Sequence, residues 1–349
     1  MGGYGIFIMF FVVIYSMYMG YNDGSLAIST TIVTRATKPK TALLLTALIK
    51  FTVPIFSLVT TLMVSGGVGL EVANKLGTQL FITTLPTGKE GFVFLFSGLM
   101  GSLLWAMISY FAKLPNSITH TLIGGIIGAG IVNMGFLSVN WKGYVILNVI
   151  AMVAIAPLVA FILGFVLLKI IKKLASKGPN RHVGNILVWV QRINFIFLSG
   201  SFASNNWQKT FGVVLLASSI GLINMGGNTM TWVVIIIASS MMIGILTGGT
   251  KIIMTTGKKL FNVGPIHSVT AQLTASIVST VSNTAGIALG VGQAMTASII
   301  GAGTADRMNA VKWARARKVA TGWVTTFPIA ALFGAGFYAL MATIMGIPL

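Results

Sequence analysis

The sequence predicts an all-α polytopic membrane protein made of two inverted-topology repeats of about five spans each. Apolar runs long enough to cross a hydrocarbon core of about 30 Å recur along the whole chain. The pentapeptide at 126–130 returns at 299–303, and each copy is followed at similar spacing by a tryptophan and then a proline. The flanking charge differs between the copies, because Lys142 alone follows the first and a cluster of cations at 307–318 follows the second.

Composition places the chain in a membrane. Hydrophobic residues make up 55% of the sequence and charged residues only 8%, with a mean hydropathy of +0.92, which excludes a soluble domain of this size. The net charge of +19 comes from Lys and Arg that cluster in short loops between apolar runs. Such loops set membrane orientation, so we expect membrane lipid, and no nucleic acid, as the partner of the basic surface.

Cytoplasmic loops collect Lys and Arg, so the unequal flanking charge indicates that equivalent points of the two repeats lie on opposite membrane faces. Five spans in each repeat invert the second relative to the first, and both termini are then external. This architecture is typical of secondary transporters. We expect the cytoplasmic membrane as location. The predicted crossings are 5–34, 41–66, 91–112, 115–138, 143–168, 194–224, 231–249, 266–289, 290–305 and 319–346.

The repeats define the domain organisation. The first occupies 1–168, a basic cytoplasmic linker follows at 169–193, and the second occupies 194–349. Basic segments at 35–40, 169–181, 251–259 and 307–318 then share the cytoplasmic face. The segment 75–85, within an external loop, is left open as an additional hairpin.

The first crossing contains a polar interruption. A helix over 5–34 would be about 45 Å long, too long for one crossing unless it is broken, and Gly20–Ser25 supplies polar, glycine-flanked residues at its middle. The matching place in the second repeat is 200–206. Broken helices in corresponding positions mark the substrate site of a secondary transporter. Asp23 is the one carboxylate within an apolar run, so it is either a site residue or the cap of a broken helix.

A second constellation lies at 115–120. Proline followed by Ser117 and Thr119 starts a helix whose free N–H groups, together with two hydroxyls, can cradle an anion. The alternative is an ordinary helix cap at the membrane surface. Lys50 and Lys209 lie within apolar spans, where each is either a cation near the site or a side chain that reaches back to the interface. Gln208 and Lys209 can supply hydrogen-bond donors to an oxyanion.

Enzymatic chemistry has little support. The chain has no cysteine, and its three histidines have no zinc-type spacing. A Gly-x-Ser-x-Gly elbow and a phosphate-binding Gly-x-x-x-x-Gly-Lys-Ser/Thr loop are both absent from the sequence. We therefore expect no enzyme, metal or organic cofactor, with an intramembrane hydrolase based on Ser117 and His120 as a remote alternative.

Several motifs resemble, in order, the signatures of the inorganic phosphate transporter (PiT) family. They are Gly20–Asp23, Pro115–His120 with the glycine-rich 124–130, the run FASNNWQKTFG at 202–212, and the segment Gly286–Gly303. The resemblance covers nearly the whole chain. It implies inverted repeats and transport of inorganic phosphate by alternating access, coupled to Na⁺ or H⁺, and it permits a homodimer.

The resemblance also implies a site. Asn22, Asp23 and Ser25 would line it, with Asp23 holding the coupling cation, and Ser117 and Thr119 would cradle the anion. The opposite wall of the site would be formed by Asn205, Asn206 and Gln208. The residues expected to tune its charge are Lys50, His120, Lys209 and Gln293.

Three departures from the family pattern bear on coupling or on anion binding. The places where the resemblance implies a glutamate after the first signature of each repeat hold Lys50 and Gln272. The second Asn-Asp is Asn205-Asn206, and the second hydroxyl-rich run is Gly290–Gln293, which lacks hydroxyls. With few acids to hold Na⁺, we expect anion transport with weak or proton-based coupling. The alternatives are a permease for another oxyanion such as sulfate, or a non-transporting scaffold or sensor derived from a transporter.

Overall fold

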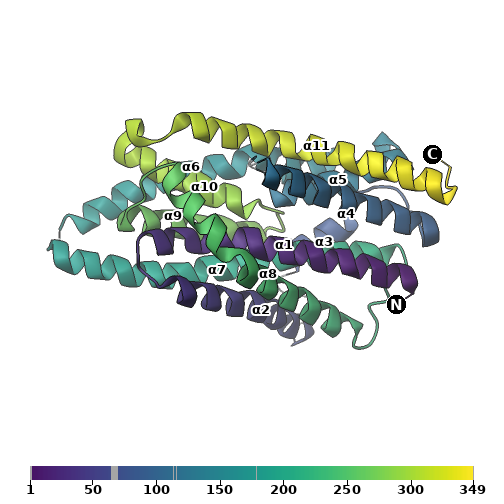
Figure 1. Ribbon diagram of the computed structural model, residues 1–349, viewed down its shortest axis with the longest axis horizontal. Helices are drawn as coiled ribbons and strands as arrows, with labels where there is room; N and C mark the ends of the chain where they lie inside the picture. Colours follow the sequence, from purple (N-terminus) through teal and green to yellow (C-terminus); the bar gives the residue numbers. More distant parts are fainter. Residues whose placement is uncertain (1, 64–69, 113, 115, 178, 349) are drawn as a thin grey trace.

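The computed structural model describes residues 2–63, 70–112, 114, 116–177 and 179–348, which form a bundle of helices (Figure 1). Seven helical stretches are long and apolar enough to cross a membrane, which confirms the prediction of an all-α polytopic membrane protein. They are Gly3–Val33, Pro39–Met63, Gly88–Phe111, Trp141–Ala175, His182–Ser219, Thr229–Thr247 and Trp313–Met345. The elements in chain order are α1 (Gly3–Val33), α2 (Pro39–Met63), α3 (Glu71–Thr78), α4 (Gly88–Phe111), α5 (Ile118–Met134), η1 (Phe136–Ser138), η2 (Trp141–Ile150), α6 (Ala151–Ala175), α7 (Asn180–Ser219), α8 (Thr229–Lys259), α9 (Pro265–Thr284), α10 (Val291–Arg307), η3 (Met308–Ala310) and α11 (Trp313–Met345).

Three predicted crossings take a different form. Helices α5 and α10 have 17 residues each, about 25 Å of helix, which is shorter than a hydrocarbon core. Helix α9 is rich in serine and threonine and is not among the apolar spans. Short or polar helices are tolerated at membrane depth when protein surrounds them. Much of each of these three helices is buried against its neighbours.

The predicted breaks in the first and sixth crossings are wrong. Helix α1 runs unbroken through 20–25, and α7 runs unbroken through 200–206. The physical reason is a close backbone approach between helices and a local hydrogen bond, which the sequence does not reveal. A Cβ at Gly20 would lie 2.2 Å from the Met241 carbonyl oxygen, so this glycine allows α1 to approach α8 closely. The Ser25 hydroxyl donates to the Tyr21 carbonyl oxygen (2.6 Å) and is satisfied within the intact helix.

The interruptions in the helical path occur instead before α5 and α10. The Tyr15 hydroxyl of α1 donates to the carbonyl oxygen of Ile118, the first residue of α5 (2.8 Å). Lys209 of α7 donates to the carbonyl oxygen of Leu289, two residues before α10 (2.7 Å). Both helices therefore begin in the protein interior, against the interior stretches of α1 and α7.

The structure also describes the segment left open and the linker. The open segment 75–85 is the end of the short helix α3 followed by a single antiparallel bridge between Phe81 and Val139, and not a hairpin. Residues 169–193 are mostly helical, because α6 continues to Ala175 and α7 begins at Asn180. Pro115 and the side chains of 251–259, which the sequence analysis singled out, lie outside the described residues.

Close contacts at glycine join the two halves of the chain reciprocally. A Cβ at Gly128 of α5 would lie 1.9 Å from the Ala331 carbonyl oxygen of α11. A Cβ at Gly301, the equivalent residue of α10, would lie 2.1 Å from the Phe161 carbonyl oxygen of α6. Only glycine permits such backbone approach. Each short interior helix is thus packed against the last long helix of the opposite half.

The connections after α5 and α10 have the same hydrogen bonds. The Trp141 indole N–H donates to the Phe136 carbonyl oxygen (2.8 Å), and that of Trp313 donates to the Met308 carbonyl oxygen (3.0 Å). Both chain termini lie at one end of the bundle, and the α1–α2, α6–α7 and α10–α11 connections lie at the other (Figure 1). The basic segments that join these helices therefore gather at the end opposite the termini.

We predict that Gly128→Ala and Gly301→Ala each destabilise the protein by about 1–3 kcal/mol, because the new methyl group overlaps a backbone oxygen of the adjacent helix. Gly336→Ala in α11 is the matched control, since a Cβ there meets nothing within 4 Å. Helix propensity makes that change neutral or stabilising by up to about 1 kcal/mol. Thermal unfolding in detergent measures all three, and equal midpoints would contradict the packing account.

Candidate functional site

A buried carboxylate and two buried ammonium groups form the centre of the bundle. Asp23 of α1 is 5% exposed, Lys50 of α2 is 0% exposed and Lys209 of α7 is 1% exposed. Asp23 interacts electrostatically with both lysines. A Cβ at Gly24 would lie 3.0 Å from Lys50 Cε, which places the Lys50 side chain against α1 beside the acid. Lys50 therefore reaches the centre and does not extend to the membrane interface.

The starts of α5 and α10 meet at the Leu289 carbonyl oxygen. The Thr119 hydroxyl donates to this oxygen (3.1 Å), and so does the Lys209 ammonium (2.7 Å). Ser117 is the residue that precedes α5, and its side chain makes no capping hydrogen bond to the helix. Free N–H groups at a helix start carry partial positive charge and favour an anion.

Gly290, the residue before α10, leaves space between polar groups. A Cβ at this position would lie 2.3 Å from Gln293 Oε1 and 2.9 Å from Ser117 Oγ. The hydroxyl from one half and the amide from the other therefore border the same small space. Any side chain at 290 would fill it, so glycine keeps the two helix starts open towards each other.

Several buried polar groups at the centre have no hydrogen-bond partner among the described residues. They are the Lys50 ammonium and both polar atoms of the Asn206 and Gln293 amides. Asn206 lies beside the Asp23 carboxylate without a hydrogen bond of ordinary length. Buried groups of this kind are costly unless something binds them. The centre is thus suited to a polar, anionic ligand.

His120 is held by two hydrogen bonds. Its Nε2 lies 3.2 Å from the Val149 carbonyl oxygen, and its Nδ1 lies 2.7 Å from Ser117 Oγ. A carbonyl oxygen can only accept, so Nε2 carries the hydrogen. In the neutral ring Nδ1 then accepts from the Ser117 hydroxyl, and His120 orients the serine.

Other residues singled out in the sequence point elsewhere. Asn205 donates to Asn283 Oδ1 (2.5 Å), which ties α7 to α9. Gln208 Oε1 accepts from the Val72 N–H (3.0 Å), and its side chain borders a cavity of about 700 Å³ on another face of α7. The Asn22 amide donates to Asp23 Oδ1 (3.3 Å), so it supports the acid.

Two contributors were missed by the sequence analysis. Leu289 acts through its backbone carbonyl oxygen, and the pattern of side chains in a sequence does not predict which backbone carbonyl will accept these hydrogen bonds. Tyr15 fixes the start of α5 through the hydrogen bond to Ile118. A tyrosine within an apolar run has a hydroxyl that needs a hydrogen-bond partner when buried, and this feature of the sequence could have identified Tyr15.

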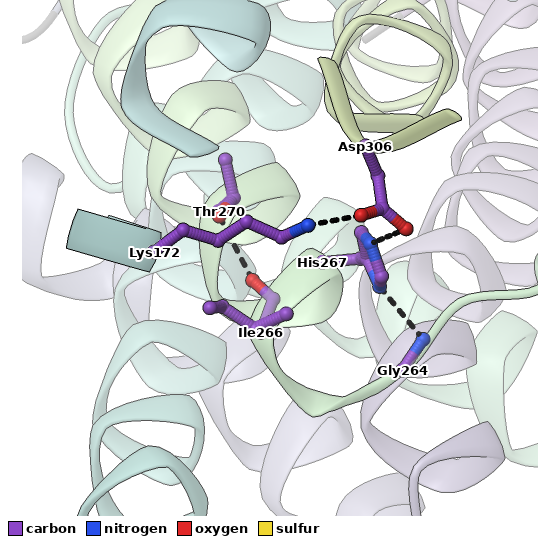
Figure 2. Close-up of polar contacts among 6 residues, drawn as sticks. All are labelled: Lys172, Gly264, Ile266, His267, Thr270 and Asp306. Atoms are coloured by element: carbon purple, nitrogen blue, oxygen red, sulfur yellow. Dashed lines mark hydrogen bonds and ion pairs between the residues drawn. The ribbon is translucent and has the colours of Figure 1, made fainter. Parts of the chain in front are cut away.

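A polar junction lies near the α10–α11 connection, at the basic end of the bundle (Figure 1), and Figure 2 shows its residues. Asp306 near the end of α10 pairs with Lys172 of α6, and its Oδ2 lies 3.1 Å from His267 Nε2 at the start of α9. The Gly264 N–H donates to His267 Nδ1 (3.2 Å). This junction joins the ends of three helices.

The corresponding junction lies near the end of α5, in the other half. Asn133 donates to Glu90 Oε1 of α4 (2.6 Å) and to the Tyr338 hydroxyl of α11 (2.5 Å). The junction near the end of α10 thus contains an ion pair, whereas the junction near the end of α5 contains one carboxylate, Glu90, with an amide and a hydroxyl.

The fold defines a multi-pass integral membrane protein with a charged centre of the kind found on the transport paths of membrane carriers. A model of the phosphate transporter family matches residues 19–334. The chain belongs to this family, which confirms the resemblance stated from its motifs.

Individual relatives agree. A probable low-affinity inorganic phosphate transporter of Bacillus subtilis (strain 168) is 28% identical over 323 residues, covering 92% of each chain. One of Mycobacterium leprae (strain TN) is 30% identical, covering 94% of this chain and 76% of that protein. A solved structure described as the sodium-dependent phosphate transporter superposes with a TM-score of 0.83 at 16% identity, covering 98% of this chain and 99% of that one. At this identity the superposition supports the fold alone.

We predict that Asp306→Asn makes the protein less stable by about 1 kcal/mol at neutral pH, because the junction loses its ion pair. The Lys172 hydrogen bond lowers the pKa of Asp306. Its stabilising effect is therefore complete above the unfolded-chain pKa of about 4 and is lost as pH falls through the lower folded-state pKa. Unfolding midpoints of wild type and variant should converge at acidic pH. A constant difference down to pH 3 would contradict this assignment.

Proposed function

We propose that the protein is a secondary transporter that moves inorganic phosphate across the cytoplasmic membrane by alternating access. The observation that carries the proposal is the convergence of the α5 and α10 starts on a buried acid and two buried lysines. Helix N-termini, hydroxyls and ammonium groups are the donors that a tetrahedral oxyanion requires. Family membership and the names of the relatives support phosphate as the substrate.

The proposed substrate site takes its residues from both halves. The free N–H groups at the start of α5 bind the anion from one side, where Ser117 and Thr119 shape the wall, and Asn206 and Gln293 bind it from the other. Asn22 and Ser25 support α1 around Asp23, and Asn205 and Gln208 support α7 through their contacts to α9 and α3.

The reciprocal glycine contacts and the matched tryptophan hydrogen bonds support the proposal that the halves are inverted repeats, divided near 169–193. In such a carrier the two halves alternate around a fixed site.

Asp23 is the proposed acid for the coupling cation. One carboxylate next to two ammonium groups is better suited to a proton than to several Na⁺ ions, since each further cation adds repulsion in a medium of low dielectric constant. Na⁺ and H⁺ are the two coupling ions that an uptake experiment should compare.

We propose a carrier and not an enzyme. The ring nitrogen of His120 that faces away from Ser117 meets the Val149 carbonyl oxygen, where a hydrolase would have a carboxylate. This geometry favours a serine that binds over a serine that attacks.

We predict that the protein, reconstituted in liposomes, takes up radiolabelled phosphate saturably and that Asp23→Asn lowers the rate at least tenfold. Removal of the acid leaves Lys50 and Lys209 without their shared counter-charge. Glu71→Gln is the control, because this exposed acid at the start of α3 lies outside the proposed site. Uptake of sulfate in preference to phosphate would contradict the assignment of phosphate as substrate. Absence of any uptake would favour a non-transporting scaffold or sensor.

A second prediction concerns the Thr119 hydroxyl at the start of α5. Thr119→Val keeps the shape of the side chain and removes its hydroxyl, so Leu289 loses one of its two donors at the start of α10. We expect the KM for phosphate to rise about tenfold, with protein stability reduced by about 1 kcal/mol. Thr60→Val in α2, whose hydroxyl bonds only within its own helix, is the matched control. An unchanged KM would exclude a role of this contact in shaping the site.

A further inference from the structure

Lys50 differs from the other charged groups of the centre in having no hydrogen bond. Its ammonium is fully buried and unpartnered within the described part of the chain. The Lys209 ammonium, in contrast, donates to the Leu289 carbonyl oxygen. A buried ammonium without a partner is strongly unfavourable, and proteins retain one where a bound group satisfies it.

The charged groups around Lys50 do not satisfy it. Asp23 on α1 is the one described carboxylate that interacts with Lys50, and it also interacts with Lys209 on α7. His120 adds no charge in the neutral form, in which Nε2–H donates to the Val149 carbonyl oxygen and Nδ1 accepts from the Ser117 hydroxyl. One carboxylate thus faces two lysine side chains, so the centre has one positive charge in excess when all three groups are ionised.

An excess of one positive charge matches one monovalent anion. Burial of an unbalanced charge is costly, so the centre is best satisfied when the bound ligand has a charge of −1. A divalent anion would leave one negative charge unbalanced, and a monovalent anion with an added Na⁺ would leave one positive charge. While Asp23 is ionised, the charge set therefore favours a monovalent oxyanion bound without a metal cation.

We propose that Lys50 is a built-in counter-cation of the substrate site, which contacts the bound anion directly and makes binding of monovalent phosphate independent of Na⁺. This inference rests on the proposed function and specifies how its site selects the ionic form of the substrate. Lys50 is then a specificity-determining residue whose ammonium balances the charge of the anion, a role that a bound Na⁺ would otherwise have.

Equilibrium binding of radiolabelled inorganic phosphate to the purified full-length protein tests this proposal. Binding is measured in sodium chloride and in choline chloride, at pH 6 and pH 8. We expect wild-type Kd values within twofold in the two salts at each pH, and little displacement by sulfate. A loss of affinity above tenfold in choline, or ready displacement by sulfate, would overturn the proposal without any variant.

Three variants complete the test. Lys50→Gln should weaken phosphate binding in choline about 10- to 100-fold, as expected for loss of a hydrogen bond to a charged group, with partial recovery in sodium. Lys50→Arg keeps the charge and should stay within a few-fold of wild type. Lys38→Gln, an exposed lysine near the start of α2, is the control.

The outcomes separate the two proposals. Wild-type affinity in Lys50→Gln would overturn the role of Lys50 and leave phosphate transport intact. If wild type binds phosphate only in the presence of Na⁺, the role of Lys50 is likewise overturned and phosphate transport is left intact. Absence of phosphate binding by wild type in every condition would overturn the proposed function together with this inference. Recovery of Lys50→Gln binding in sodium would also show that the variant is folded.

Discussion

The carbonyl oxygen of Leu289 is the point on which the centre of this structure depends. It accepts hydrogen bonds from Thr119 of the first half and Lys209 of the second, so it joins the start of α5, the start of α10 and the middle of α7. A backbone carbonyl at membrane depth must be satisfied by protein, because lipid offers no donor. These two donors therefore allow a non-helical segment to exist inside the bundle, and with it two helix N-termini that face a buried charged centre.

The same requirement explains the rest of the packing. Helices that begin in the interior must be enclosed, and glycine contacts at Gly128 and Gly301 enclose α5 and α10 against α11 and α6. Each contact crosses from one half to the other, so neither half can move without changing the surroundings of the site. Junctions near the ends of α5 and α10 differ in charge, with Asn133 in one and Asp306 in the other.

Much of this candidate site could be predicted from sequence, because a charged side chain within an apolar run is costly unless it has a functional or structural partner. Asp23, Ser117, Thr119 and Lys209 were identified in this way. The predicted break at 20–25 was wrong because a glycine serves a helix break and a close helix contact equally well, and the Met241 carbonyl that decides between them is distant in sequence. The placement of Gln208 against α3, and the role of the Leu289 carbonyl, depend on tertiary contacts that leave no pattern along the chain.

The most direct test of the central claim is a crystal structure of the protein with arsenate, a tetrahedral analogue of phosphate whose arsenic atom can be located by anomalous scattering. The account predicts one strong peak at the α5 and α10 starts, with the arsenate oxygens about 3 Å from Ser117 Oγ and Lys50 Nζ. A peak in the cavity beside Gln208, or at the basic end near Asp306, with the central space unoccupied by arsenate, would contradict it.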